Sequence, residues 1–379
     1  MKLVFASDSF KGSLGSSRTA ELLSAAAREV FGDVETVSIP LADGGEGTVE
    51  AVVAATGGTL RTALVRGPRG KAVEATYGIL GSGDAIIEMA AASGLPLLHT
   101  NERDPLVTST YGTGELILHA IDEGARSITL AIGGSATNDG GMGCMRALGA
   151  RFLDEHDNEL EGVGGDLVRV AHIDLAGMDK RLARTSFVVM CDVDNPLLGE
   201  RGATRVFGPQ KGADPTMVNE LEQGMASYAH VLSQYFDGFD PTASGMGAAG
   251  GLGAAARAFL NAKLQPGIER VLDLVGFDDL LQDCDLCVTG EGHADEQSAH
   301  GKVISGIAQR CVRAGVPCVA IVGGMDAEAC ELLNVGVSAL VPAVIDACTV
   351  EEALANAERN YMLAAQRVFS LLKIPAAWA

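Results

Sequence analysis

Apolar and polar positions follow a regular order at the start of the chain. Residues 2–6 form a short β-type run and residues 34–39 a second predicted strand, and each is followed by a polar loop. Behind the first loop, apolar residues recur at helical spacing, with Ser16 or Ser17 as the expected N-cap; behind the second, a helix is expected through about Ala55. Strand, polar loop and helix therefore occur twice in succession, which is typical of a doubly wound parallel sheet.

The pattern changes from about Gly57. Three short β-like runs, residues 59–67, 71–80 and 85–90, are joined by Gly and Pro turns with little room for crossover helices. This change indicates the start of a second domain. Alternation then returns, with helices expected over 113–123, 141–148, 214–236 and 248–260 and strands over 128–132 and 187–191.

The last third of the chain repeats the pattern of the first residues. Strands are expected over 286–289, 317–322 and 337–344, and a helix over 302–313; the final helix begins at a capping box of Thr349 and Glu352. Because the two ends share one style, we expect an α/β protein. Its discontinuous Rossmann- or flavodoxin-like parallel-sheet domain comprises residues 1–65 plus 285–379, and a second, mixed α/β domain, residues 66–284, is inserted.

Composition narrows the class of partner. Aromatic residues make up only 4%, so the core must be mostly Ala, Val, Leu and Ile, as in parallel sheets covered by helices. The formal charge of 28 minus 49, or −21, argues against nucleic acid and anionic membranes as partners. A phosphate site must then be built locally, from backbone amides and a few basic residues.

The sequence also indicates a cytoplasmic protein. The first residues, MKLVFASDSF, do not resemble a signal peptide, and no uninterrupted apolar run is long enough to span a membrane. Most of the eight cysteines lie in apolar contexts. Cys284 and Cys287 form a C-x-x-C, but no second pair accompanies them, so buried reduced thiols are favoured over a zinc site.

Six polar or Gly-rich loops follow predicted strands or open predicted helices. A single loop of this kind is equally well explained as a surface turn. Six of them, nearly all with a carboxylate, favour a ligand cleft at the strand ends of an open α/β sheet, and we expect at least three to converge. They are Asp8–Ser13, Asp43–Thr48, Gly133–Gly141, Asp192–Pro196, Gly245–Gly253 and Gly290–Lys302.

The familiar signatures are absent or incomplete. Gly245 to Gly250 matches G-x-G-x-x-G, but no strand precedes it, which argues against a dinucleotide site and leaves a closely packed helix start or a phosphate at a helix N-terminus. The sequence has no Walker A, protein-kinase or G-x-S-x-G motif. His293 and His300 lie near other polar residues, where a solvated or hydrogen-bonding role is favoured over metal ligation.

The loops do carry the residue types that phosphoryl transfer needs. Such a reaction requires backbone amides around the polyphosphate and a cation that neutralises charge on the transferred phosphoryl group. It also requires Mg²⁺ ligands and a base for the acceptor hydroxyl. Lys11 and Lys302 are candidate cations, with ordinary surface lysine as the alternative. For each candidate Mg²⁺ ligand or base, capping a helix or stabilising a turn is the alternative role. The candidates are Asp43, Glu46, Asp139, Asp192, Asp194 and Asp295.

With these loops in view, the chain resembles the bacterial type 1 glycerate kinases over essentially its whole length. The resemblance implies two α/β domains with the active site in the cleft between them, and transfer of the ATP γ-phosphate to a hydroxyl of D-glycerate with Mg²⁺, giving 2-phosphoglycerate. It rests on DSFKGSL (8–14), PLADGGEGT (40–48), AIIEMAAASGL (85–95), YGTGELI (111–117), IGGSATNDGGMG (132–143), CDVDNPLLG (191–199), VFGPQKGA (206–213), GMGAAGGLG (245–253) and VTGEG (288–292).

The resemblance points to particular residues, and we infer a role for most of them. We expect Asp192 or Asp295 to be the base and Lys11 to neutralise phosphoryl charge; Gln210 and Lys211 are matched without a role. Expected glycerate contacts are Asp8, Ser9, Asp43, Glu46, Ser135, Thr137, Asn138 and Asn195. Expected nucleotide contacts are Gly245, Gly247, Gly250, Gly251, Gly290, Glu291, Gly292 and Lys302, and expected Mg²⁺ ligands are Asp139, Asp192 and Asp295.

One departure and several alternatives accompany this interpretation. Where the family usually has Gly-Glu-Gly-Arg, this chain has His293, so a fixed positive charge is replaced by a titratable one. The alternatives are a 3-phosphoglycerate product, a kinase for another small hydroxy acid, and a non-catalytic metabolite-binding regulator. Besides ATP and D-glycerate we expect neither nucleic acid nor membrane as a partner, and the sequence leaves a homodimer open.

Overall fold

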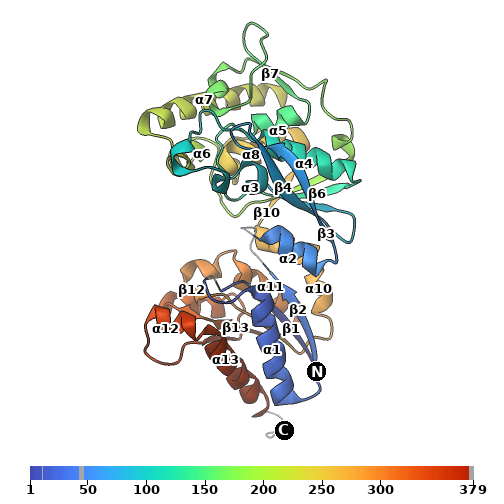
Figure 1. The fold of residues 1–379 in the computed structure, drawn as a ribbon, viewed down its shortest axis with the longest axis vertical. Helices are drawn as coiled ribbons and strands as arrows, with labels where there is room; N and C mark the ends of the chain where they lie inside the picture. Colours follow the sequence, from blue (N-terminus) through green and yellow to red (C-terminus); the bar gives the residue numbers. More distant parts are fainter. Residues whose placement is uncertain (11, 42–46, 375–379) are drawn as a thin grey trace. The chain divides into compact units, whose positions relative to one another are not determined.

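The computed structural model describes residues 1–10, 12–41 and 47–374. It is an α/β structure whose residue contacts form two compact units, each shown in Figure 1. The first unit holds the described residues up to Leu41 and those from Ile268 onward, and the second holds those from Gly47 to Gly267. The predicted α/β class with parallel sheets is confirmed.

The first unit is built on a five-stranded parallel sheet in the order β15-β13-β11-β1-β2. Counted along the chain, this is the flavodoxin-like order 2-1-3-4-5, which reverses between β1 and β11, where such sheets bind ligands outside the strands' carboxyl ends. The strands are β1 (Lys2–Ser7), β2 (Glu35–Pro40), β11 (Leu286–Thr289), β13 (Cys318–Val322) and β15 (Ala339–Pro342).

Helices cover both faces of this sheet. α1 (Ser16–Phe31) and α13 (Ala357–Leu372) pack together over the face to which Leu3, Phe5 and Val288 point. Since side chains alternate along a strand, Val4 and Cys287 point to the opposite face, where α11 (Val303–Ala314) lies. The remaining elements are α9 (Gly267–Leu274), α10 (Phe277–Leu280), β12 (His293–Ala294), the 3₁₀ turns Glu296–Ala299 and Ala327–Leu333, β14 (Gly324–Met325) and α12 (Val350–Ala355).

The second unit contains a six-stranded mixed sheet in the order β10-β9-β6-β5-β4-β3. The first four of these strands run parallel, while β3 and β4 add antiparallel pairs at one edge. The strands are β3 (Thr59–Arg66), β4 (Ala72–Ile79), β5 (Ala85–Glu88), β6 (Ser127–Ala131), β9 (Ser186–Met190) and β10 (Lys263–Gln265), with a small β7 (Arg151–Leu153) and β8 (His172–Asp174) pair besides.

Helices of the second unit connect and cover these strands. Its α-helices are α2 (Thr48–Ala55), α3 (Ala90–Ser93), α4 (Tyr111–Asp122), α5 (Met142–Ala147), α6 (Ala203–Phe207), α7 (Pro215–Tyr235) and α8 (Ala248–Leu260). Short 3₁₀ turns occupy Leu95–Leu97, Thr100–Glu102, Gly164–Arg169, Leu182–Arg184 and Pro209–Lys211. None of the helices among the described residues is both long and apolar enough to cross a membrane.

The units divide at different residues from those predicted. The predicted boundary at residue 65 falls within β3, which pairs with β4 in the second sheet, and α2 also packs on that sheet. At the other boundary, residues 268–284 belong to the first unit rather than to the insertion. Arg310 of α11 holds them there through ion pairs to Glu269 (2.6 Å), Asp273 (2.6 Å) and Asp278 (2.8 Å).

The N-cap of one helix and the length of another differ from those predicted. α1 begins at Ser16 with Gly15 as N-cap and no side-chain cap, so neither Ser16 nor Ser17 serves as predicted. The Thr349–Glu352 capping box is present, with the Glu352 amide 3.2 Å from the Thr349 hydroxyl. The helix it opens, α12, ends at Ala355, and α13 begins anew after Asn356.

Candidate functional site

The carboxyl ends of four strands surround a cavity of about 620 Å³ in the first unit. The loop after β1 contributes Asp8 and Ser9, and the loop after β11 contributes Glu291 and Gly292. These two loops are tied together because the Asp8 amide donates a hydrogen bond to the Gly290 carbonyl at 2.9 Å. The cavity therefore lies at the point where the strand order reverses, as the rule for open α/β sheets requires.

One wall of this cavity is apolar and the other is polar. Phe10 and Leu14 meet residues of α12 and α13 on the apolar side, where Phe10 packs edge-on to Tyr361 with ring centroids 5.1 Å apart. On the polar side lie the Gly323 and Gly324 backbone and the side chain of Lys302, the N-cap residue of α11. Such a division fits a ligand with a flat apolar end and a charged end.

Asp8, Glu291 and Lys302 line the polar side, and Asp295 lies next to them as the ion-pair partner of Lys302. Lys302 Nζ is 3.7 Å from Asp295 Oδ1. Burial raises the pKa of Glu291, and the negative charges of Asp8 and Asp295 add to this rise, while a hydrogen bond with Ser298 and the charge of Lys302 oppose it. Burial also acts on Asp295, but Lys302 and the hydrogen bonds from Ser298 outweigh it and hold the pKa of Asp295 below its usual range.

His293 lies at the rim of the same cavity, on β12. Its Nε2 is 3.3 Å from Asp326 Oδ1, an ion pair when the imidazole is protonated. The side chain is exposed, as expected for the solvated alternative. Of the other predicted site residues, the same cavity is lined by Asp8, Ser9, Glu291, Gly292 and Lys302, and Asp295 pairs with Lys302. Gly290 has a packing reason to be glycine, because a Cβ there would overlap the Ile321 carbonyl.

Three of the predicted loops converge in the second unit. The Gly140 amide donates to the Gly250 carbonyl at 2.9 Å, and the Gly247 amide donates to the Asn195 carbonyl at 2.9 Å. The loop after β6 is therefore packed against the glycine-rich stretch 245–253, which is packed in turn against the loop after β9. This arrangement brings together the segments 133–141, 191–199 and 245–253 from distant parts of the sequence.

Asp139 is the centre of the first of these loops. Its side chain is fully buried, and its carboxylate accepts hydrogen bonds from the Thr110 amide (2.7 Å) and hydroxyl (2.8 Å) and from the amides of Gly141 (3.0 Å) and Gly143 (3.2 Å). Burial raises the pKa of Asp139, and these donors oppose the rise. Asp139 was expected to be an Mg²⁺ ligand or a loop brace, and because both carboxylate oxygens accept hydrogen bonds this geometry favours the brace.

Lys211 is a buried cation beneath the same loop. It is 1% exposed, and its Nζ donates to the Thr137 carbonyl at 2.7 Å. Burial lowers the pKa of Lys211 to about 7, and the nearby charge of Asp139 acts against that shift. The family resemblance matched this lysine without giving it a role, and its place in the motif VFGPQKGA (206–213) was the available signal.

Comparison with known proteins identifies the family. The glycerate kinase family profile matches residues 3–373. Glycerate 2-kinase of Escherichia coli K12 is 45% identical over 375 residues, covering 99% of this chain and 98% of the relative. Glycerate kinase of Bacillus cereus is 45% identical over 377 residues, with the same coverage.

The chain belongs to the glycerate kinase family. It is therefore a kinase, as predicted, and the regulator hypothesis is set aside. A solved structure agrees: a Salmonella typhimurium LT2 protein provisionally assigned as glycerate kinase 2 matches with a TM-score of 0.90 and 45% identity, covering 100% of this chain and 99% of that one.

Within this family fold, the glycines of the stretch 245–253 are explained by packing. Ala249, Gly250 and Gly251 have consecutive left-handed conformations, with φ of 52°, 66° and 93°. A Cβ on Gly250 would overlap the Thr137 carbonyl, and one on Gly251 would lie 2.8 Å from the Gly140 Cα. Their close approach is thus to protein backbone, and the predicted nucleotide role of Gly245, Gly247, Gly250 and Gly251 gains no support.

Replacing Gly250 by alanine tests this packing. We expect Gly250→Ala to lower the free energy of unfolding by about 2–4 kcal/mol, because it combines a left-handed backbone with a steric overlap. Gly238 is the matched control, since its φ is +74° and nothing lies within 4 Å of a Cβ there. Gly238→Ala should lower the free energy of unfolding by only about 1 kcal/mol. Equal losses for the two variants in urea denaturation would show that the overlap with the Thr137 carbonyl does not contribute to the effect at Gly250.

Other predicted substrate contacts are less accessible than expected. Thr137 and Asn138 are fully buried, so in this conformation neither side chain is open to a substrate, and Ser135 is nearly as buried. The Asn195 side chain donates to the Arg201 carbonyl at 2.7 Å, and Asp194 pairs with Arg201 at 2.8 Å. Lys11, Asp43 and Glu46, by contrast, lie outside the described residues.

Asp192 is exposed at the end of β9 and remains a candidate base or Mg²⁺ ligand. Its Oδ1 accepts a hydrogen bond from the Gly267 amide at 2.8 Å. A second cavity, of about 660 Å³, adjoins it and is lined by Cys191 and Val193 and by the cations Arg257 and Lys263.

Lys211 should give the protein a measurable pH dependence. Since its pKa is about 7 when folded and about 10.4 when unfolded, the unfolded chain binds more protons between these values, and stability rises with pH across that window. We expect the free energy of unfolding of the wild type, relative to Lys211→Met, to rise between pH 7 and pH 9 by up to about 1.4 kcal/mol per pH unit. Urea titrations of both proteins measure it, and a difference independent of pH would refute the burial of a titrating lysine.

Proposed function

We propose that this protein transfers the γ-phosphate of ATP to the 2-hydroxyl of D-glycerate, releasing ADP and 2-phosphoglycerate. The single observation that carries the proposal is full-length membership of the glycerate kinase family, including 45% identity to a relative named glycerate 2-kinase. The cavity of the first unit supports it independently, because its lining suits a nucleotide. A cytoplasmic location is proposed on the same grounds and on the sequence.

The cavity fits ATP in size and in the placement of its polar groups. Its volume of about 620 Å³ lies in the range of ligand pockets. Val350 and Leu354 of α12 are exposed apolar residues that line it, and they offer a surface for a purine ring. The backbone at Gly292 and Gly323, with Lys302, offers amides and a cation for the phosphates.

The donor set around the cavity also suits Mg²⁺. Asp8, Glu291 and Asp295 supply hard carboxylate oxygens, the ligands that Mg²⁺ prefers, and Glu291 Oε1 has no hydrogen-bond partner among the described residues. We propose Asp8 and Glu291 as metal-holding residues, joined by Asp295 if Asp192 is the base. A bound Mg²⁺ would neutralise charge on the phosphate oxygens.

The chain's own residues would then position the reactants and handle the proton. The glycerate hydroxyl oxygen forms a bond to the γ-phosphorus while the bond to the β-phosphate oxygen breaks, and the hydroxyl proton passes to a carboxylate. Asp295, kept ionised by its lowered pKa, or Asp192 is the proposed acceptor. Lys302 would stabilise charge on the transferred group, and Asp8 and Ser9 would contact substrate.

A substrate panel separates this proposal from its alternatives. Purified protein with ATP and Mg²⁺ is offered D-glycerate, L-glycerate, glycolate and lactate, and ADP release is followed. We expect kcat/KM for D-glycerate to exceed the others by at least about tenfold. An acid that lacks one of the two glycerate hydroxyls, or carries it in the opposite configuration, would leave the protein groups that bind this hydroxyl without a partner. Equal or better turnover of another hydroxy acid would establish the alternative kinase.

A further inference from the structure

We infer that Cys287, Cys311 and Cys318 form a binding site for a trivalent metalloid, of which arsenite is the accessible representative. The site lies inside the first unit, between the parallel sheet and α11, and is separate from the residues proposed for phosphoryl transfer. It was not anticipated from the sequence, where only the spacing of Cys284 and Cys287 drew attention. The inference does not depend on the proposed function.

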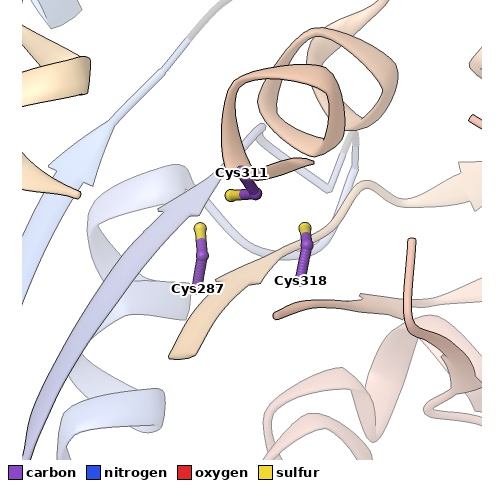
Figure 2. A group of neighbouring side chains, drawn as sticks. All are labelled: Cys287, Cys311 and Cys318. Atoms are coloured by element: carbon purple, nitrogen blue, oxygen red, sulfur yellow. The ribbon is translucent and has the colours of Figure 1, made fainter. Parts of the chain in front are cut away.

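The fold brings three thiols together from three elements. Cys287 of β11 and Cys318 of β13 are directly paired across neighbouring parallel strands, so their side chains leave the sheet on the same face. Cys311 of α11 lies over that face, and Figure 2 shows the two strand sulfurs directed toward the helix that carries it. The three Sγ atoms all lie within 4.8 Å of one another, and all three residues have no exposed surface.

The chemistry of this pocket selects the ligand. It presents three soft sulfur donors, which favour soft, thiophilic ions over Mg²⁺ or Ca²⁺. Because it is completely buried, a bound species that keeps net charge would incur a large desolvation penalty. Three thiolates with a monovalent ion leave a charge of −2 and with a divalent ion −1, whereas a trivalent ion leaves none.

The binding reaction is balanced without any redox step. Arsenite in neutral solution is the uncharged acid As(OH)₃, which can enter an apolar interior. Three As–O bonds are replaced by three As–S bonds, and each thiol proton leaves with a hydroxide as water, so that one As(OH)₃ and three thiols give one As(S-Cys)₃ and three waters. Arsenic stays trivalent throughout, and no charge is created inside the protein.

Bound arsenic would cross-link β11, β13 and α11. A link among residues 287, 311 and 318 closes the chain segments between them, which restricts the unfolded state and should raise the melting temperature. Entry must await a local opening because the thiols are buried. Cys284 is only partly buried and close enough to Cys311 and Cys318 for their charges to interact, so it offers a more accessible thiol near the site.

Sodium arsenite binding to the full chain tests the inference. The exposed Cys330 and Cys348 are first changed to alanine, so that they cannot compete. After exchange into arsenite-free buffer, native mass spectrometry of this background protein should show one arsenic per chain with three protons lost. Its melting temperature should rise on loading.

Single variants of the three thiols complete the test. Cys287→Ala, Cys311→Ala and Cys318→Ala should each weaken arsenite retention at least about tenfold and abolish the three-proton mass signature. Cys284→Ala should slow loading and leave its stoichiometry at one. The inference is overturned if the background protein retains no arsenic, or if variants that fold, judged by circular dichroism, retain it as the background does.

Discussion

Replacing Lys302 by methionine is expected to lower kcat with ATP and D-glycerate by about 100- to 1,000-fold, the usual loss when a donor to transition-state charge is removed. Lys302 lines the cavity of the first unit and pairs with Asp295 at 3.7 Å. Its loss would also let the pKa of Asp295 move up, because the charge of Lys302 helps to hold it down. Steady-state kinetics over a pH range would measure both effects.

Two other lysine variants serve as controls for that experiment. Lys302→Arg keeps the positive charge and should lose less activity than the methionine variant. Lys373→Met removes a lysine of the same unit that does not line the cavity and whose Nζ donates to the Val30 carbonyl. It should keep full activity. If Lys302→Met stays within about threefold of the wild type, this cavity is not where phosphoryl charge is stabilised.

Replacing Asp139 by alanine is expected to lower the free energy of unfolding of the protein by about 3–5 kcal/mol, typical for the loss of a fully buried charged partner. The substitution removes the acceptor for four hydrogen bonds and leaves the donors on Thr110, Gly141 and Gly143 buried without it. It also leaves Lys211 without its neighbouring negative charge. Urea denaturation followed by circular dichroism measures the loss.

An exposed aspartate provides the matched comparison. Asp240 also accepts hydrogen bonds from an amide and a hydroxyl, both of Thr242 at 2.9 Å and 2.6 Å, but it does so at the surface. Asp240→Ala should cost about 1 kcal/mol or less. Similar losses for the two variants would mean that burial of Asp139 does not determine its contribution.

Much of the fold follows from local patterns in the sequence. The sequence pattern predicted β1, β2, β11 and β13 to within a residue or two. β1, β11 and β13 were recognisable because buried parallel strands need nearly continuous apolar side chains. The compact units divide at other residues than the predicted domains, because residue contacts depend on long-range packing. Nothing local to residues 268–284 reveals that their carboxylates pair with Arg310, and nothing local to β3 reveals its partner.

The candidate site was predicted at the level of loops rather than of atoms. The loops after β1 and β11 do line one cavity, and the sequence indicated both of them together with Lys302. Asp139 looked like a metal ligand because a carboxylate in a glycine-rich loop is compatible with either role until its donors are known. The glycines 245–251 looked like a phosphate loop for the same reason, since close approach to a ligand and close approach to backbone require the same residue.

The ³¹P NMR spectrum of the product tests the central claim most directly. Purified protein is incubated with ATP, Mg²⁺ and D-glycerate, and the new phosphomonoester is observed with proton coupling. Phosphorylation of the 2-hydroxyl predicts a doublet, because the phosphorus then couples to a single methine proton. A triplet, from coupling to the two protons of a 3-phosphate, would contradict the proposed position, and the absence of any phosphoglycerate signal would contradict the proposed activity.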